Sequence, residues 1–215
     1  MPVVKVPKDR LVSVLPNGSA KIKFKDIFNL KAFYNALHLW LDEYGWHAHS
    51  IKRDGSLRPD GDHYEIYYRE KIGEGGVKEM DILWRMYRSA PNSKWLRQHL
   101  DLKFKVLGTT STEVIRDGQK FKANKGEVEI TVGAWIEKTY VPAFEKHPIL
   151  KHFLQIFDSR IYEIQEKEKE LYQETYVLLN FIKQWFKLKR YLPYEETKSF
   201  YPGEAWPSHH REEGH

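Results

Sequence analysis

GEVEITVGAWIEKTY, at residues 126–140, alternates apolar and polar side chains along its length. A β-strand points successive side chains to opposite faces. One face of this stretch carries only apolar residues, namely Val128, Ile130, Val132, Ala134 and Ile136. The other face carries Glu127, Glu129, Thr131 and Trp135. The pattern predicts a strand with one side buried in a core and one side in water.

Other stretches have the same period of two. They are AKIKFKDIF at 20–28, HYEIYYREKI at 63–72, VKEMDILWRMYR at 77–88 and LDLKFKVLG at 100–108. GEGG at 73–76 and Asp117-Gly118 are turn sequences that would join neighbouring strands into hairpins. We therefore expect one curved antiparallel sheet of about six strands with a single buried face.

Helical spacing appears in two places. A shorter helix follows the first strand, with Asp26 or Asn29 as its cap and Gly45 as its end. From Pro148 to Arg190 nothing interrupts a second helix, which would be roughly 60 Å long at 1.5 Å per residue. A strand of six residues spans only about 20 Å. Either this helix bends near Asp158-Ser159, or one end projects with an apolar stripe that needs a partner. The fold class is α+β.

The composition of the chain excludes several kinds of functional site. The chain has 215 residues, of which 41% are hydrophobic and 30% charged, and a formal net charge of +5. The absence of cysteine excludes disulfides, thiolate nucleophiles and cysteine-ligated metals. We see neither a run of about 18 apolar residues nor a signal peptide, and expect a cytoplasmic protein. The expected division is an extended arm at 1–20, one domain at 21–190, and a polar and aromatic tail at 191–215.

The order of these elements, over roughly residues 20–190, resembles the START-like, helix-grip fold. That resemblance implies an apolar ligand held between sheet and helix. The chain departs from the pattern because its C-terminal helix is longer and only one helix is clear after the first strand. Separately, KGEVEITVGAWIEKTY, HPILKHF and RIYEIQ look like stretches of uncharacterised proteins from small-genome archaea, which implies no activity.

The leading functional hypothesis is a non-enzymatic binding or assembly protein. In this hypothesis the sheet covers one half of the long helix, and the other half associates with a second copy or a protein partner. The residues expected to bind that partner are Leu171, Leu178, Leu179, Ile182, Trp185 and Phe186.

Two alternatives remain open. A carrier of a hydrophobic small molecule would line its cavity with Tyr64, Tyr68, Trp84 and Phe104, between sheet and helix. A nucleic-acid-binding protein would use basic residues near aromatic ones. The candidates are Lys103, Lys105, Lys183, Lys187, Lys189 and Arg190. An interaction of the same basic residues with a membrane surface is less favoured.

Signals for catalysis are weaker. His47 and His49 form a His-x-His pair that could ligate a metal, but solvated loop histidines are the more ordinary interpretation. Gly73, Gly75 and Gly76 lie between two strand patterns and therefore predict a hairpin turn rather than a phosphate-binding loop. No nucleophile elbow or other catalytic motif is present. We expect no cofactor and no enzymatic activity.

Overall fold

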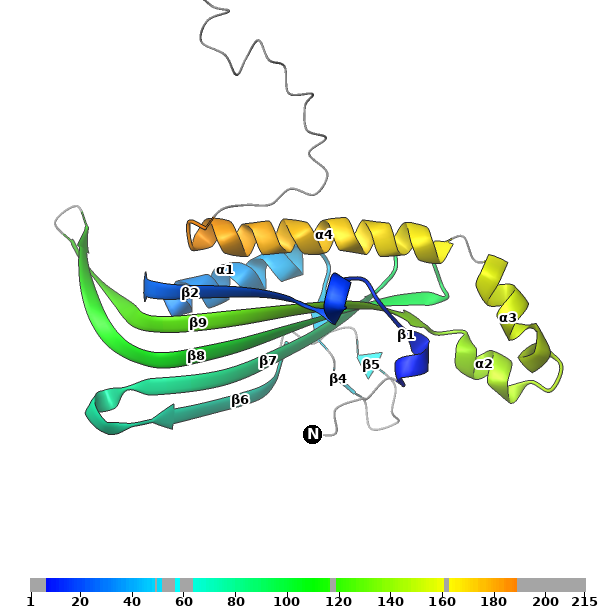
Figure 1. Cartoon of the computed structure of the whole chain (residues 1–215), viewed down its shortest axis with the longest axis horizontal. Coiled ribbons are helices and arrows are strands. Elements are labelled where there is room, and N and C mark those ends of the chain that lie inside the picture. Colours follow the sequence, from blue (N-terminus) through cyan, green and yellow to red (C-terminus); the bar gives the residue numbers. More distant parts are fainter. Residues whose placement is uncertain are drawn as a thin grey trace, which may run out of the picture.

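A single antiparallel sheet organises the chain (Figure 1). The computed structural model describes residues 7–48, 50–51, 57–58, 64–116, 119–160 and 163–188. The main sheet has seven strands, one more than expected. They are β1 (Leu11–Ser13), β2 (Ala20–Phe28), β3 (His47–Ala48), β6 (Glu65–Ile72), β7 (Lys78–Ser89), β8 (Leu96–Arg116) and β9 (Gln119–Lys138). A separate small ladder pairs β4 (Ser50–Ile51) with β5 (Leu57–Arg58).

The centre of the sheet is the long hairpin of β8 and β9. Its register runs from Leu96 opposite Lys138 to Arg116 opposite Gln119. The predicted turn residues, 117 and 118, lie outside the described ones. On one side β9 pairs with β2 and β1, and on the other β8 pairs with β7, which then pairs with β6 and β3. The first long strand therefore lies beside the last one.

The hairpin bends where its register shifts, between the pairs of Leu107 and Thr110. Gly108 has a φ of 59°, in the region that glycine adopts at little cost. Opposite it, a Cβ atom on Gly126 would lie 2.9 Å from the Cα of Thr109. Bulges and glycines of this kind sharpen the local bend of a strand. The far end of the hairpin accordingly curves out of the plane of the sheet (Figure 1).

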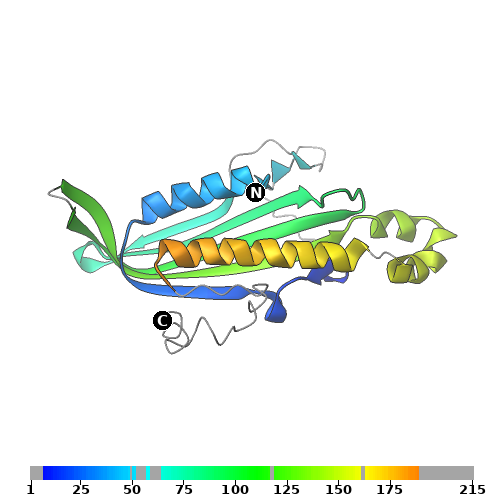
Figure 2. The ribbon, with the colours of Figure 1, turned by 90° about the horizontal axis from the view of Figure 1, so that it is seen from above.

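Two helices cover one face of the sheet. Helix α1 (Leu30–Glu43) begins at Asn29, whose side-chain oxygen accepts a hydrogen bond from the backbone nitrogen of Ala32 at 2.9 Å. Gly45, with a φ of 71°, follows its end as predicted. Helix α4 (Glu163–Trp185) runs beside α1 along the sheet (Figure 2). Phe33 of α1 contacts Phe186, just after α4, at 4.9 Å between ring centroids.

The core lies between these helices and the sheet. The predicted inward faces are confirmed for β7, β8 and β9, whose alternating apolar residues are all buried. Aromatic rings fill much of the layer. Trp84 contacts Tyr34, Phe104 and Tyr64 at 4.4, 5.3 and 5.8 Å between ring centroids.

One arginine joins α4 to the sheet and to the end of α1. The guanidinium of Arg88 pairs with the carboxylate of Glu174 and donates to the backbone oxygen of Tyr44 at 2.7 Å. It also donates to Gln98 Oε1 at 2.7 Å and lies 4.5 Å over the ring of Trp46. Glu174 in turn accepts from the indole of Trp46 at 3.0 Å. These contacts position the middle of α4.

The sequence left open whether the helix expected from 148 to 190 bends near Asp158-Ser159, and the structure has two helices in this stretch. Helix α3 (Leu150–Arg160) is a separate element from α4, and residues 161 and 162 lie outside the described ones. The short helix α2 (Val141–Lys146) packs on α3 through Phe144 and Phe157, at 4.7 Å between ring centroids. Together α2 and α3 form a helical extension beyond one end of the sheet (Figure 1).

The N-terminal segment is not a free arm in its described part. After the 3-10 turn η1 (Lys8–Arg10), strand β1 pairs with β9, and η2 (Pro16–Gly18) leads into β2. A third 3-10 turn, η3 (Glu74–Gly76), connects β6 to β7 as the glycine-rich sequence predicts. The predicted tail at 191–215 lies outside the described residues.

Candidate functional site

The second face of the sheet carries no helix in the described part of the chain (Figures 1 and 2). We call it the open face. Its side chains come from the outward positions of β2, β6, β7, β8 and β9. Basic residues outnumber acidic ones there. The basic residues are Lys21, Lys23, Lys25, Arg69, Lys71, Arg85, Arg97, Lys103 and Lys105; the acidic ones are Glu79, Asp81, Asp101, Glu127, Glu129 and Glu137.

Strand register aligns these charges in rows across the sheet. One row runs from Arg69 through Asp81, Lys105 and Glu129 to Lys23. Side chains directly opposite each other on neighbouring strands are close enough to interact. Arg69 pairs with Asp81, while Lys23 lies 3.7 Å from Glu129. Most carboxylates of the open face are neutralised by such neighbours.

Lys103 and Lys105 differ from the other basic residues of this face. Both side chains are exposed, and neither forms an ion pair with a carboxylate of the described residues. They lie two residues apart on β8, which separates them by about 7 Å along the strand. Two positive charges on the open face are therefore available to an anion.

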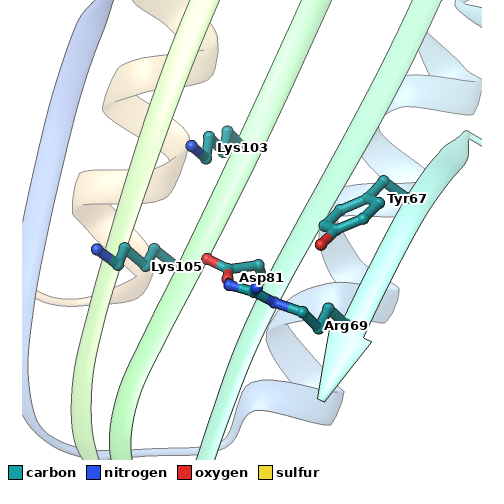
Figure 3. A pocket seen from close by; sticks show the side chains of 5 residues that line it. All are labelled: Tyr67, Arg69, Asp81, Lys103 and Lys105. Atoms are coloured by element: carbon teal, nitrogen blue, oxygen red, sulfur yellow. The ribbon is translucent and has the colours of Figure 1, made fainter. Parts of the chain in front are cut away.

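A hollow of about 340 Å³ lies beside these lysines. Its lining comes from three neighbouring strands: Tyr67, Arg69, Asp81, Lys103 and Lys105. Figure 3 shows their side chains on one face of the sheet, with Asp81 between the lysines and Arg69. The ring of Tyr67 is 47% exposed, so a planar group can reach it.

Asp81 determines the electrostatics of the hollow. The hydrogen bond and charge of Arg69, with smaller contributions from the charges of Lys103 and Lys105, hold the pKa of Asp81 below its ordinary value against the opposing effect of burial. Asp81 is thus ionised at neutral pH and keeps Arg69 in place. The two lysines remain as the positive groups that can bind a further anion.

The opposite end of the open face is more enclosed. His99 is buried there and its Nε2 lies 2.7 Å from Glu137 Oε2, to which Arg97 donates at 3.2 Å. The ring of Trp135 lies over Gly133, because a Cβ at that glycine would fall 2.2 Å from the indole. A flat indole on the sheet surface is a second aromatic platform beside Arg85 and Asp101, which are paired at 2.7 Å.

The residues predicted to bind a protein partner lie elsewhere and are mostly unavailable. Five of them, Leu171, Leu178, Leu179, Ile182 and Phe186, are buried against the sheet and α1 within this chain. Only Trp185 is exposed, at 38%. This site prediction is wrong, because the apolar stripe of α4 is part of the chain's own core.

The predicted ligand-cavity residues are not brought together around a space. Tyr64, Trp84 and Phe104 are buried and contact one another or Tyr34. Tyr68 is instead exposed near the sheet edge, where its hydroxyl donates to Glu70 at 2.9 Å. In the described residues these positions form a filled core and an outer surface.

The predicted nucleic-acid residues separate into two groups. Lys103 and Lys105 lie on the open face, as the alternation of β8 predicts. Lys183 lies in the last turn of α4 and Lys187 two residues after its end, and α4 belongs to the other layer of the molecule (Figure 2). Lys189 and Arg190 lie outside the described residues.

The histidine pair gives no metal centre within the described chain. His47 lies on β3 opposite Tyr87, while His49 is outside the described residues. Among the side chains that the structure describes, no group of three histidine, aspartate or glutamate residues could hold a metal ion.

Sequence reasoning missed Tyr67, Arg69 and Asp81 as neighbours of the lysines. Tyr67, Arg69 and Lys71 also alternate with period two in HYEIYYREKI, on the face opposite to Tyr68. That signal identifies an outward face. The pairing of Arg69 with Asp81 depends on the register between β6 and β7, which a single strand does not reveal.

The chain matches no protein-family model, no curated protein and no solved structure. Across the described helices, none has the length and apolar character needed to cross a bilayer.

Proposed function

We propose that this protein binds single-stranded nucleic acid on the open face of its sheet. The proposal rests on one observation. Lys103 and Lys105 are exposed and form no ion pair with a carboxylate of the described residues, and they lie beside the exposed side chain of Tyr67 on a face that none of the described helices covers. Ammonium groups contact backbone phosphates, and exposed aromatic rings stack on unpaired bases.

The shape of the site favours an extended ligand. The hollow is lined from one side only, by three neighbouring strands, so it does not enclose a small molecule. Basic side chains continue across the sheet, beyond Thr131, from Lys103 to Lys21, which is paired with Glu129 at 2.9 Å, and along β2 to Lys25. A polyanion can follow these groups over several residues, whereas a single phosphate would use only one or two of them.

Binding to duplex DNA is less well supported. A duplex is read by a helix or a ribbon that enters a groove. The open face is broad and carries aromatic rings, which suits bases that are unstacked and accessible. Tyr67 and Trp135 are the rings available for stacking in the described part of this face.

The test is the affinity for a fluorescent oligouridylate, measured by anisotropy over a range of salt. Lys103→Gln/Lys105→Gln should bind roughly tenfold more weakly at low salt. Its log–log salt slope should be shallower by about 1.4, because two phosphate contacts are lost. Both side chains are exposed, so stability should change by less than about 0.5 kcal/mol.

Lys183→Gln/Lys187→Gln is the matched control, since it removes the same charge from the helical layer. It should leave both the affinity and the salt slope nearly unchanged. If both double variants lose affinity equally, binding reflects net charge rather than the open face. If neither changes the slope, the proposed phosphate contacts are absent.

A further inference from the structure

Helix α3 exposes an apolar ridge, which we define as Ile149, Leu150, Phe153 and Ile156. Their exposed fractions are 63%, 39%, 51% and 54%. Ile149 directly precedes α3, and within the helix Leu150 and Ile156 are each three residues from Phe153, the spacing of neighbours on a helix surface. Phe157, on another side of α3, contacts Tyr140 and Phe144 at 5.0 and 4.7 Å between ring centroids. The extension thus has its own internal contacts, and the side chains of the ridge are largely exposed.

The size of the ridge decides between a second copy and another partner. With roughly 200 Å² for each large apolar residue, these exposed fractions amount to about 400 Å². Two ridges packed together would bury about 800 Å², which is below the roughly 1,000 Å² of a stable protein interface. A patch of about 400 Å² on a monomer is nevertheless large enough to indicate an interaction site.

One exposed lysine precedes the ridge, and a second lies on another side of α3. Lys146 and Lys151 are exposed on either side of Ile149 in the sequence. The nearby carboxylate of Glu145 is paired with Arg10 at 2.9 Å. Figures 1 and 2 place the extension beyond the end of the sheet, so a flat surface can reach α3 without meeting the strands.

We propose that α3 attaches the protein to the surface of a bilayer that contains anionic lipids. A helix with an apolar side and flanking lysines lies in the plane of the interface, with its apolar residues among the acyl chains. Phe153, Ile149 and Ile156 would enter the interface, and Lys146, which precedes the ridge, would contact the headgroups. Each lysine near an anionic surface adds attraction that salt weakens.

The test is flotation of the full chain with two kinds of vesicle, one of phosphatidylcholine alone and one with added phosphatidylserine. The chain should float with the anionic vesicles and bind the neutral ones much more weakly. Phe153→Ser/Ile156→Ser should reduce binding to anionic vesicles by about tenfold or more, because two apolar side chains no longer enter the lipid. Both positions are exposed, so thermal unfolding should be unchanged.

Two variants make the test specific. Ile72→Ser/Ile115→Ser removes two isoleucines of similar exposure from the hairpin ends, and it should bind vesicles normally. Lys103→Gln/Lys105→Gln should also bind vesicles, which separates this attachment from the proposed nucleic-acid site. The proposal is overturned if the lysine variant loses vesicle binding while the α3 variant keeps it. A dimer in light scattering that Phe153→Ser/Ile156→Ser dissociates would also overturn it, in favour of self-association.

Discussion

At the scale of single residues, Glu137 shows how the open face is held together. Burial raises the pKa of Glu137, but the hydrogen bond and charge of His99 and the charge of Arg97 lower it by more. The pKa therefore lies below its ordinary value of 4.5. A carboxyl group whose pKa is lowered by folding stabilises the protein in its ionised form.

We expect this contribution to depend on pH with a defined sign. It should be complete above the ordinary pKa near 4.5, begin to disappear below it, and be absent below the lowered pKa of the folded state. Glu137→Gln should therefore be less stable than the unaltered chain at neutral pH, and the difference should shrink as the pH falls below about 4.5. Urea denaturation of both proteins at several pH values measures this difference in the free energy of unfolding. An equal difference at every pH would contradict a stabilising charge at Glu137.

The sequence predicts only part of how single residues are arranged on the open face. Alternation in β8 and β9 assigns Lys103, Lys105 and Trp135 to the outer face, and the structure confirms these assignments. Alternation does not reveal which outward residues are opposite one another. That requires the register of each strand pair, which is why the contact between Arg69 and Asp81 is found only in the structure.

At the scale of elements, the length of the hairpin explains why α4 does not project beyond the sheet. The prediction compared a long helix with strands of ordinary length. Strands β8 and β9 contain 21 and 20 residues, so they span about 65 to 70 Å at 3.3 Å per residue. Helix α4 has 23 residues, or about 35 Å. The sheet is therefore long enough to cover the whole of α4, and α3 is the part that extends beyond it.

The helical spacing of the apolar residues in α4 agrees with the prediction. Their environment differs from it, because they are buried in the core of the chain. Leu171, Leu178 and Ile182 have a spacing that suits either a core or an interface between proteins. Only the position of the sheet decides between the two. The exposed apolar residues of α3 lie at the other end of the predicted helix, and their spacing alone does not distinguish them from core residues.

This assignment of α4 to the core has a measurable consequence. Ile182 is fully buried, so Ile182→Ala should lower the free energy of unfolding by about 3 kcal/mol through lost apolar contact and the cavity that remains. Val177→Ala, at a position of α4 that is 45% exposed, removes only two methyl groups and should cost less. Guanidinium denaturation of both variants gives the comparison. Equal and small effects would mean that α4 does not pack on the sheet as described.

At the scale of the whole molecule, the two proposed surfaces are separate. The hollow lies on the open face of the sheet, and the ridge lies on an extension beyond one end of it (Figure 1). No residue belongs to both. Binding at one surface should therefore leave the other accessible, which allows a protein attached to a bilayer to hold a nucleic acid at the same time.

Flotation with a labelled oligouridylate tests this arrangement. RNA should float with anionic vesicles only when the protein is present, because the bilayer itself repels RNA. Lys103→Gln/Lys105→Gln should leave the protein on the vesicles but lose most of the RNA. Phe153→Ser/Ile156→Ser should lose both from the floating fraction while binding RNA normally in solution. If RNA instead displaces the unaltered protein from vesicles, the two ligands compete for one basic surface, and the separation of the two sites would be wrong.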